Sequence, residues 1–253
     1  MTEIAIISVT HKQYWMPEDM AYLPVQVGNG PDFGYKRDNT GDNISNKNKN
    51  FCELTALYWA WKNVKADYIG LDHYRRHFAS GRIGSKKNRV ATQAYLDHFI
   101  TRYDVILPRK RHYFIETNRS QYIHAHHKED LDVLETVLKE KYPKIMPYYE
   151  KDMEKTSGHK FNMFIMKYDV LSSYCSFLFD VLFEVEKRLD ISSYSAYDAR
   201  VFGFLSERLL DVYIDWRDLS CKEISYVYME HINWFKKGYM FLRRKVNGNN
   251  NEE

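Results

Sequence analysis

The chain has 253 residues, a length that fits one domain built around a single large core. Hydrophobic residues make up 44% of it and charged residues 28%, a composition that excludes collagen-like and intrinsically disordered proteins. Its 37 basic and 34 acidic residues nearly cancel, so the surface as a whole does not complement nucleic acid, and we expect no nucleic-acid partner.

The cysteines and the apolar runs bear on the compartment. Cys52, Cys175 and Cys221 lack the close spacing of metal and redox sites, which fits free thiols in a reducing cytosol. The first residues enter a strand pattern without the basic and apolar regions of a signal peptide, and no apolar run has the length of a membrane span. We therefore expect a cytoplasmic protein.

In the first part of the chain, short apolar runs flank one long polar segment. Residues 4–9 form an apolar run that predicts a buried strand. Residues 24–50 are rich in Gly, Pro, Asn and Asp, which predicts a long functional loop. Asn50 and Glu53 resemble a capping box, and apolar residues recur after them at helical spacing. A second buried strand is expected at 68–71.

The rest of the chain continues the alternation of strands and helices. We expect, in chain order, a helix at 95–100, a strand at 104–107, a helix at 131–138 ended by Pro143, a strand at 161–166, a helix at 171–185 and a last strand at 212–216. This alternation predicts an α/β layered domain over residues 1–232, with a mostly parallel central sheet.

The segment 69–78, IGLDHYRRHF, places one carboxylate, two imidazoles and two guanidiniums at the end of a predicted strand, where open α/β sheets bind ligands. Arg75 and Arg76 match the oxygens of a diphosphate. Asp72 and His73 could instead hold a divalent cation, Mn²⁺ or Mg²⁺, for the same purpose. The alternative is that the arginines form ordinary salt bridges and that His73 is a satisfied core histidine.

A longer resemblance adds to this chemistry. The runs FCELTALYWAWKN (51–63) and DYIGLDHYRRHF (67–78) resemble the signature of a family of bacterial capsule and exopolysaccharide glycosyltransferases, long described as a domain of unknown function. Some members of that family are galactofuranosyltransferases. Further matching segments follow the same order: DNIS (42–45), YDVILP (103–108), HAHHKEDL (124–131), FNMFIMK (161–167) and RVFGFLSERLLDVYI (200–214). The resemblance covers roughly residues 3–215.

The resemblance implies a GT-A-like fold, in which a single Rossmann-type domain binds a nucleotide sugar. The first strand and loops near it are then expected to bind the uridine, through Ser8, Thr10, His11, Asp42 and Asn43. The strand that ends at Asp72 is expected to carry the diphosphate or the metal. Two positions after Asp72 the chain has Tyr74 instead of the second acid of the usual Asp-X-Asp pattern, so the resemblance leaves the metal dependence open.

The resemblance also implies an activity: transfer of a hexose, galactofuranose or galactose, from a uridine diphosphate (UDP) sugar to a lipid-linked oligosaccharide. An inverting transferase needs a general base for the acceptor hydroxyl. Glu207 is the first candidate and Asp198 the second, although Glu207 beside Arg208 could equally form a surface ion pair. For the whole protein, the alternative is a non-catalytic nucleotide-sugar-binding module of a polysaccharide assembly complex.

A group of possible metal ligands precedes the predicted helix at 131–138: His124, His126, His127, Glu129 and Asp130. Their spacing matches no familiar structural zinc site and no cysteine lies nearby, so we expect His126 and His127 to bind the acceptor instead. Asn162 lies in an apolar strand, where the resemblance implies a contact with the acceptor sugar. Its partner could equally be the backbone.

The segment 233–246 predicts a basic amphipathic helix. Its apolar residues Phe235, Tyr239, Leu242 and Val246 share one face, and five Lys and Arg residues lie near them. Such a helix can bind the anionic inner leaflet of the membrane and bring an enzyme to a lipid-linked acceptor. The alternative is a helix docked on the core with a solvated charged face. The polar tail 247–253 is predicted to be disordered.

Overall fold

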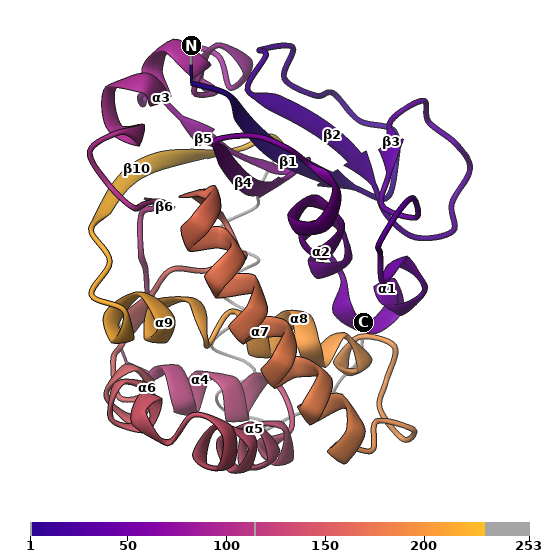
Figure 1. Cartoon of the computed structure of the whole chain (residues 1–253), viewed down its shortest axis with the longest axis vertical. Coiled ribbons are helices and arrows are strands. Elements are labelled where there is room, and N and C mark those ends of the chain that lie inside the picture. The colour runs from indigo at the N-terminus through magenta and orange to yellow at the C-terminus, as the bar shows by residue number, and fades with distance from the viewer. Residues whose placement is uncertain (1, 114, 231–253) are drawn as a thin grey trace.

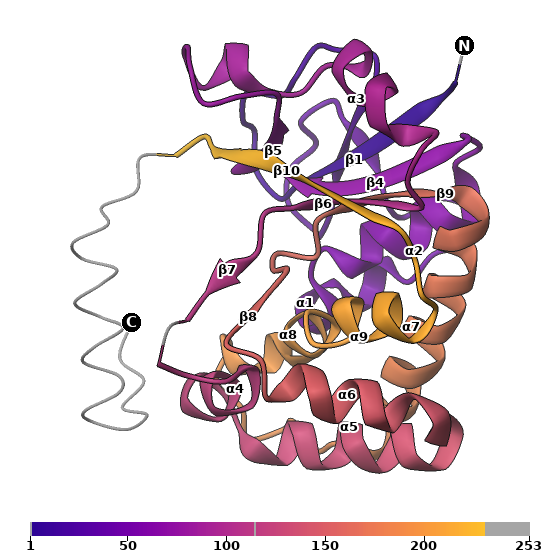
Figure 2. The ribbon, with the colours of Figure 1, turned by 90° about the vertical axis from the view of Figure 1, so that its left-hand side faces the viewer.

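The structure is a computed structural model that describes residues 2–113 and 115–230. In these residues an eight-stranded sheet lies above a layer of helices (Figures 1 and 2). The strands of the sheet are β1 (Ile4–Thr10), β2 (Tyr22–Gln26), β3 (Lys36–Arg37), β4 (Tyr68–His73), β5 (Arg76–Ala79), β6 (Val105–Pro108), β9 (Phe164–Lys167) and β10 (Cys221–Tyr228). A separate pair is formed by β7 (Arg111–His112) and β8 (Ser157–Gly158).

Most of the helices cover one face of the sheet, and Figure 2 shows α3 on the other face. The α-helices of the described residues are α1 (Asn48–Phe51), α2 (Leu54–Asn63), α3 (Gln93–Ile100), α4 (Asn118–Ala125), α5 (Lys128–Lys141), α6 (Met146–Met153), α7 (Tyr168–Arg188), α8 (Val201–Ser206) and α9 (Leu210–Trp216). The predicted helices near 95–100, 131–138 and 171–185 are confirmed as α3, α5 and α7.

The central sheet is mixed, so the α/β class is confirmed and the expectation of a mostly parallel sheet is wrong. β1 is parallel to β2 and β4, β2 to β3, and β6 to β10. β9 is antiparallel to β4 and β6, and β5 is antiparallel to β4 and β10. Only the two residues Tyr74 and Arg75 join β4 to β5, and so short a connection requires antiparallel strands.

The strand β1 shows why the apolar runs could be predicted. Ile4 and Ile6 pack in the smaller core, which includes residues of α3, while Ile7 and Val9 pack in the larger core on the opposite face. Because successive side chains of a strand point to opposite faces, a strand covered on both sides is apolar at every position.

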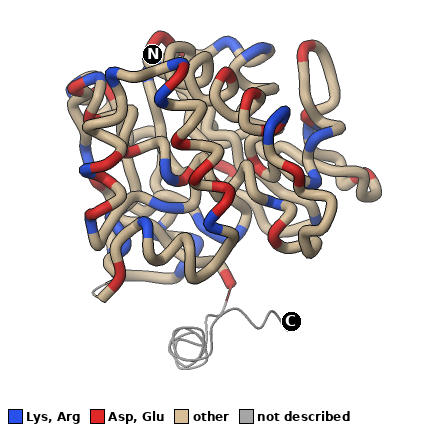
Figure 3. The backbone as a smooth tube through the Cα atoms, turned by 90° about the horizontal axis from the view of Figure 1, so that it is seen from below, with Lys and Arg blue, Asp and Glu red and all other residues tan. Residues whose placement is uncertain are grey.

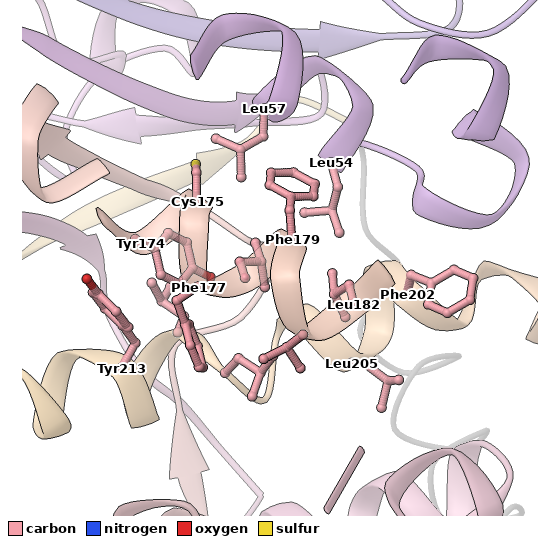
Figure 4. Close-up of a cluster of buried hydrophobic side chains, with 14 of the residues drawn as sticks. Leu54, Leu57, Tyr174, Cys175, Phe177, Phe179, Leu182, Phe202, Leu205 and Tyr213 are labelled. Carbon is pink, nitrogen blue, oxygen red and sulfur yellow. The ribbon is translucent and has the colours of Figure 1, made fainter. Parts of the chain in front are cut away.

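The larger core joins the sheet to α2, α7 and α8. Figure 4 shows buried side chains of the three helices in one cluster, among them Leu54, Leu57, Tyr174, Cys175, Phe177, Phe179, Leu182, Phe202 and Leu205. The helix α7 has 21 residues, and its buried positions recur every three or four residues. This cluster therefore sets the position of α8 and the residues next to it relative to the sheet.

The helix predicted after Glu53 is confirmed as α2, and the short helix α1 precedes it. Cys52 separates α1 from α2 with a φ of 51°, a left-handed backbone conformation that interrupts the helix. The expected capping box is wrong, because Asn50 donates its side-chain hydrogen bond to the carbonyl oxygen of Ala199 at 2.6 Å, and Glu53 makes no side-chain cap.

Two further expectations are wrong. Residues 212–216, expected as a strand, lie in α9, because the packing of the core overrides the strand propensity of Val212, Tyr213 and Ile214. The expected loop at 24–50 includes most of β2, as well as β3 and α1. β2 was not predicted because proline is uncommon in strands. Pro24 is tolerated in β2 because β3 pairs only with Val25 and Gln26.

Charge is spread evenly over the described backbone. Figure 3 shows basic and acidic residues interspersed, which agrees with the near-cancellation of the total charge. Within residues 2–113 and 115–230, no helix has the length and hydrophobicity needed to cross a bilayer. The expected helix at 233–246 and the expected disordered tail at 247–253 lie outside the described residues.

Candidate functional site

The candidate site lies where β4 changes its neighbour in the sheet. β4 pairs with β9 from Tyr68 to Leu71, and with β5 only through His73. Asp72 and His73 therefore lie at a fork between two strands. A pocket of about 200 Å³, here called the fork pocket, opens beside them and is lined by Cys52, Glu53, Asp72, His73, Arg75, Arg76, Phe161, Tyr197, Arg200, Gly203, Phe204 and Glu207.

Asp72 is tied to the scaffold of the sheet. Its Oδ1 accepts a hydrogen bond from Ser8 Oγ at 2.6 Å, and its Oδ2 lies 2.8 Å from His77 Nδ1. All three side chains are buried. Burial raises the pKa of Asp72, and the contacts with His77 and Ser8 partly oppose that rise. Asp72 thus fastens β4 to β1 and to β5.

The expected metal ligands do not fit a divalent cation. Both carboxylate oxygens of Asp72 already have partners, and His73 lies in the field of two arginines. No group of three ligand-type side chains occurs in the part of the chain that the structure describes. The positive charge at the fork comes instead from the protein's own side chains.

Three guanidinium groups provide that charge. Arg75 forms a 3.8 Å ion pair with Glu230. Arg76 lies 4.1 Å from the ring of Phe161, and Arg200 donates from Nε to Cys52 Sγ at 3.2 Å. Among residues 2–113 and 115–230, neither Arg76 nor Arg200 has a carboxylate within ion-pair distance.

Two of these arginines have hydrogen-bond donors without an acceptor in the described part of the chain. The Nε atoms of Arg75 and Arg76 are buried without a hydrogen-bond acceptor. Burial also lowers the pKa of Arg76, because the guanidinium ion loses water in the pocket. A buried guanidinium that lacks both an acceptor and a partner carboxylate, as Arg76 does among the described residues, is suited to bind an anion.

Two histidines near these arginines favour the neutral form. Burial lowers the pKa of His73 to about 2, and Arg76 and Arg75 add to the shift. Burial and then Arg75 lower the pKa of His11 as well, although this side chain is more exposed. The site therefore carries guanidinium charge without imidazolium charge near neutral pH.

The depressed pKa of His73 predicts that acid destabilises the fold. His73 binds a proton less well in the folded state than in the unfolded state. The free energy of unfolding is therefore highest above pH 6.5, the ordinary pKa of histidine, and decreases as the pH falls below it. The slope is at most about 1.4 kcal/mol per pH unit. Urea denaturation at pH 7.5, 6.5 and 5.5 measures it. We expect His73→Gln to flatten the dependence and the exposed-site control His98→Gln to leave it unchanged; equal slopes in all three proteins would contradict the assignment.

Two glutamates face the guanidiniums, and one turn holds both. The backbone N–H of Phe161 donates to Glu207 Oε1 at 2.9 Å, and Asn162 Nδ2 donates to Glu53 Oε1 at 2.7 Å. Asn162 also accepts a hydrogen bond from Ser206 Oγ at 3.0 Å, so its side chain is fully engaged within the protein. Burial raises the pKa of Glu53, and the negative charge of Glu207 adds to the rise.

The backbone is strained where it meets these glutamates. Phe161 has a φ of 76° and Asn162 a φ of 52°, and Cys52, next to Glu53, has a φ of 51°. Non-glycine residues in this region cost about 1–3 kcal/mol each and persist where the surrounding structure enforces them. Three of the four such residues in the described chain adjoin the two carboxylates, which marks this place as a functional site.

The structure does not bring every predicted donor residue to the fork pocket. Ser8 and Thr10 are buried within β1, and Ser8 reaches the site only through its bond to Asp72. Asp42 and Asn43 do not line the fork pocket, and Asp42 accepts hydrogen bonds from Tyr58 and Asn63 of α2, so their contact with the uridine stays a prediction.

The remaining predicted residues lie behind the pocket. Asp198 is buried, accepts a hydrogen bond from Ser195 Oγ at 2.7 Å, and lies 3.9 Å from His126 and 3.7 Å from His127. His126 stacks on Phe204, a wall of the pocket, with ring centroids 4.1 Å apart. The third histidine of the segment, His124, pairs with Glu116 instead.

Seven residues of the pocket were not predicted from the sequence: Cys52, Glu53, Phe161, Tyr197, Arg200, Gly203 and Phe204. All but Tyr197 lie in segments that carry the resemblance, which is the signal that could have identified them. Glu53 was interpreted as part of a helix cap. Its approach to Glu207 depends on the turn at Phe161, more than a hundred residues away in the chain.

Comparisons with known proteins agree with this fold. The apo structure of the bifunctional glycosyltransferase WbbM matches with a TM-score of 0.81 and 27% identity over 90% of this chain and 46% of that chain. The chain thus spans less than half the length of the WbbM chain. The mannosyltransferase Ktr4p from S. cerevisiae matches with a TM-score of 0.34 and 12% identity over 92% of this chain and 72% of that chain, which is too weak to support an argument.

A search of curated proteins gives no match. A family model matches residues 5–218, and this range covers the β1 strand, the fork pocket and α9. The family resemblance seen in the sequence is thereby confirmed: the chain belongs to the family described as Domain of unknown function (DUF4422).

Proposed function

We propose that the protein is a GT-A-like glycosyltransferase of bacterial polysaccharide synthesis. Its similarity to a bifunctional glycosyltransferase, at 27% identity over 90% of the chain, supports transfer of a sugar. The observation that carries the proposal is the turn at Phe161 and Asn162, which holds Glu53 and Glu207 in a pocket with three guanidinium groups. A pocket of this kind combines an anion site with carboxylates that can accept a proton.

In the proposed reaction a UDP-hexose, with galactofuranose or galactose as the sugar, is the donor. Arg75, Arg76 and Arg200 bind the diphosphate and stabilise the charge that develops as UDP leaves. The acceptor hydroxyl oxygen attacks the anomeric carbon while the bond from that carbon to the diphosphate oxygen breaks. Glu207 accepts the hydroxyl proton, and the configuration at the anomeric carbon inverts.

Other parts of the proposal concern the partners. The acceptor is a lipid-linked oligosaccharide, and residues 233–246 bring the enzyme to the inner leaflet of the membrane in the cytoplasm. The exposed His11, at the end of β1, contacts the uridine. His126 and His127 support the acceptor side of the pocket from behind. His126 stacks on Phe204, and His127 stacks on Tyr194.

Release of UDP tests the activity. The full chain is incubated with UDP-galactose or UDP-galactofuranose and a soluble octyl glycoside, and free UDP and the extended glycoside are measured. We expect both products to appear together and to persist in EDTA, because both oxygens of Asp72 already have partners in the sheet. Binding of UDP without turnover would instead identify a non-catalytic binding module. Activity lost in EDTA and restored by Mn²⁺ would show a metal site.

The role of Arg76 predicts weaker nucleotide binding in Arg76→Gln. Loss of charge-assisted hydrogen bonds to a phosphate should raise the Kd for UDP by about 10- to 100-fold. Calorimetric titration with UDP measures the change, and Arg82→Gln, at an exposed position, is the control. An unchanged Kd in Arg76→Gln would place the diphosphate elsewhere.

A further inference from the structure

One aromatic side chain of the fork pocket is open to solvent. Tyr197 lines the pocket and is 48% exposed, whereas Phe161 and Phe204 in the same pocket are partly buried. Large exposed rings are uncommon on this protein, and those that remain exposed in a pocket offer a flat apolar surface to a ligand.

The ring of Tyr197 is supported from behind. It stacks on His126 at 5.9 Å with an interplanar angle of 18°, and it lies 5.3 Å from the ring of Phe204. His126 and Phe204 stack on each other at 4.1 Å. The three rings form a layered set whose inner members are held by the core, so the outer ring has a supported position before any ligand binds.

The backbone beside Tyr197 is fixed as well. The short 3-10 helix that follows it, Asp198–Arg200, receives a 2.6 Å hydrogen bond from Asn50 at the carbonyl of Ala199. Arg200 is tied to Cys52 Sγ. Because this turn is already ordered, a ligand that binds the exposed ring causes little further loss of conformational entropy.

The position of the ring in the fold favours one side of the reaction. The 3-10 helix continues directly into α8, and Glu207 follows α8 as its C-cap. Tyr197 and Glu207 are thus the two ends of one short segment, whereas Arg75 comes from the turn between β4 and β5 and Arg76 from the start of β5. The ring therefore belongs to the segment that leads to the proposed base. This segment also carries Arg200, whereas the other two diphosphate cations come from the sheet.

We propose that Tyr197 is the platform for the acceptor sugar. The apolar C–H face of a neutral hexose ring packs on the exposed tyrosine ring, and one of its hydroxyls then points to Glu207. This inference rests on the proposed function, since it assigns the acceptor side of the same pocket. A ring without charge suits a neutral sugar face better than a phosphate, for which the pocket has its guanidiniums.

The experiment separates acceptor binding from donor binding. Tyr197→Ala, Tyr197→Phe and the control Tyr148→Ala, which removes an exposed ring of α6, are compared with the unmodified chain. Octyl β-glycosides of galactose, glucose and N-acetylglucosamine serve as acceptor probes. KM is measured for acceptor and donor, and saturation-transfer NMR records binding of each glycoside in the absence of donor.

We expect Tyr197→Ala to raise the KM of the best glycoside by about five- to tenfold with an unchanged KM for the donor, and Tyr197→Phe and Tyr148→Ala to behave like the unmodified chain. An unchanged acceptor KM, or a raised donor KM alone, would overturn the platform. If no glycoside is extended but one binds and loses its NMR signal in Tyr197→Ala, the platform stands and the proposed function fails. If no glycoside of the panel binds, the platform fails.

Discussion

Glu207→Gln is expected to lower kcat for sugar transfer by about 10²- to 10⁴-fold, the range typical of losing a general base. The amide keeps an oxygen that can accept the hydrogen bond from the Phe161 N–H, so the strained turn retains its partner. The melting temperature should therefore change little. Initial rates at saturating donor and acceptor measure kcat, and calorimetry checks the fold.

Three comparison variants make the assignment of Glu207 specific. Glu129→Gln alters an exposed glutamate and should leave the rate unchanged. Asp198→Asn alters the second candidate, which lies behind the pocket, and should have a smaller effect than Glu207→Gln. If Glu53→Gln abolishes transfer while Glu207→Gln retains it, the base is Glu53, and the turn at Asn162 positions it.

Asp72→Ala is expected to destabilise the protein by about 2–5 kcal/mol, because it leaves two buried hydrogen-bonding groups without their partner, each at a cost of about 1–3 kcal/mol. The hydroxyl of Ser8 and the imidazole of His77 would remain buried without the carboxylate. Urea denaturation near pH 7 measures the loss. Since these contacts join β1, β4 and β5, we also expect weaker binding of UDP at the β4–β5 turn.

The matched control for Asp72 is Asp97→Ala on α3, an exposed aspartate whose removal should change stability by less than about 0.5 kcal/mol. Ser8→Ala should cost less than Asp72→Ala, because the contact of Asp72 with His77 remains. A stable Asp72→Ala protein that has lost an Mn²⁺-dependent activity would reverse this interpretation and make Asp72 a metal ligand.

Much of the fold could be predicted because many of its elements carry a clear local pattern. The apolar run at 4–9 and the helical spacing at 171–185 both follow from burial against a sheet or a core. β2 and α9 were missed for opposite reasons. Pro24 is atypical of a strand, although it lies in one. Val212, Tyr213 and Ile214 have high strand propensity, although they lie in a helix that is stabilised by packing.

Most of the predicted residues that line the fork pocket are neighbours in the sequence. Asp72, His73, Arg75 and Arg76 lie at the connection of β4 with β5, and all four line the pocket. The partners that complete the pocket come from distant segments, and no local pattern relates Glu53 to Glu207. Their proximity depends on two left-handed residues, and backbone strain of this kind arises from tertiary packing and not from local preference.

The position of β10 in the sheet has a consequence for folding during translation. β10 lies between β5 and β6, and without it β5 is joined to the sheet only by the pairing of Arg76 with His73. In the pairing of β5 with β10, Arg76 lies opposite Tyr228, and more than half of the chain separates these two residues in the sequence. In a nascent polypeptide that lacks β10, β5 would therefore be held by a single residue pair, so the proposed nucleotide binding should arise only after residues 221–228 have been synthesised and have paired with β5.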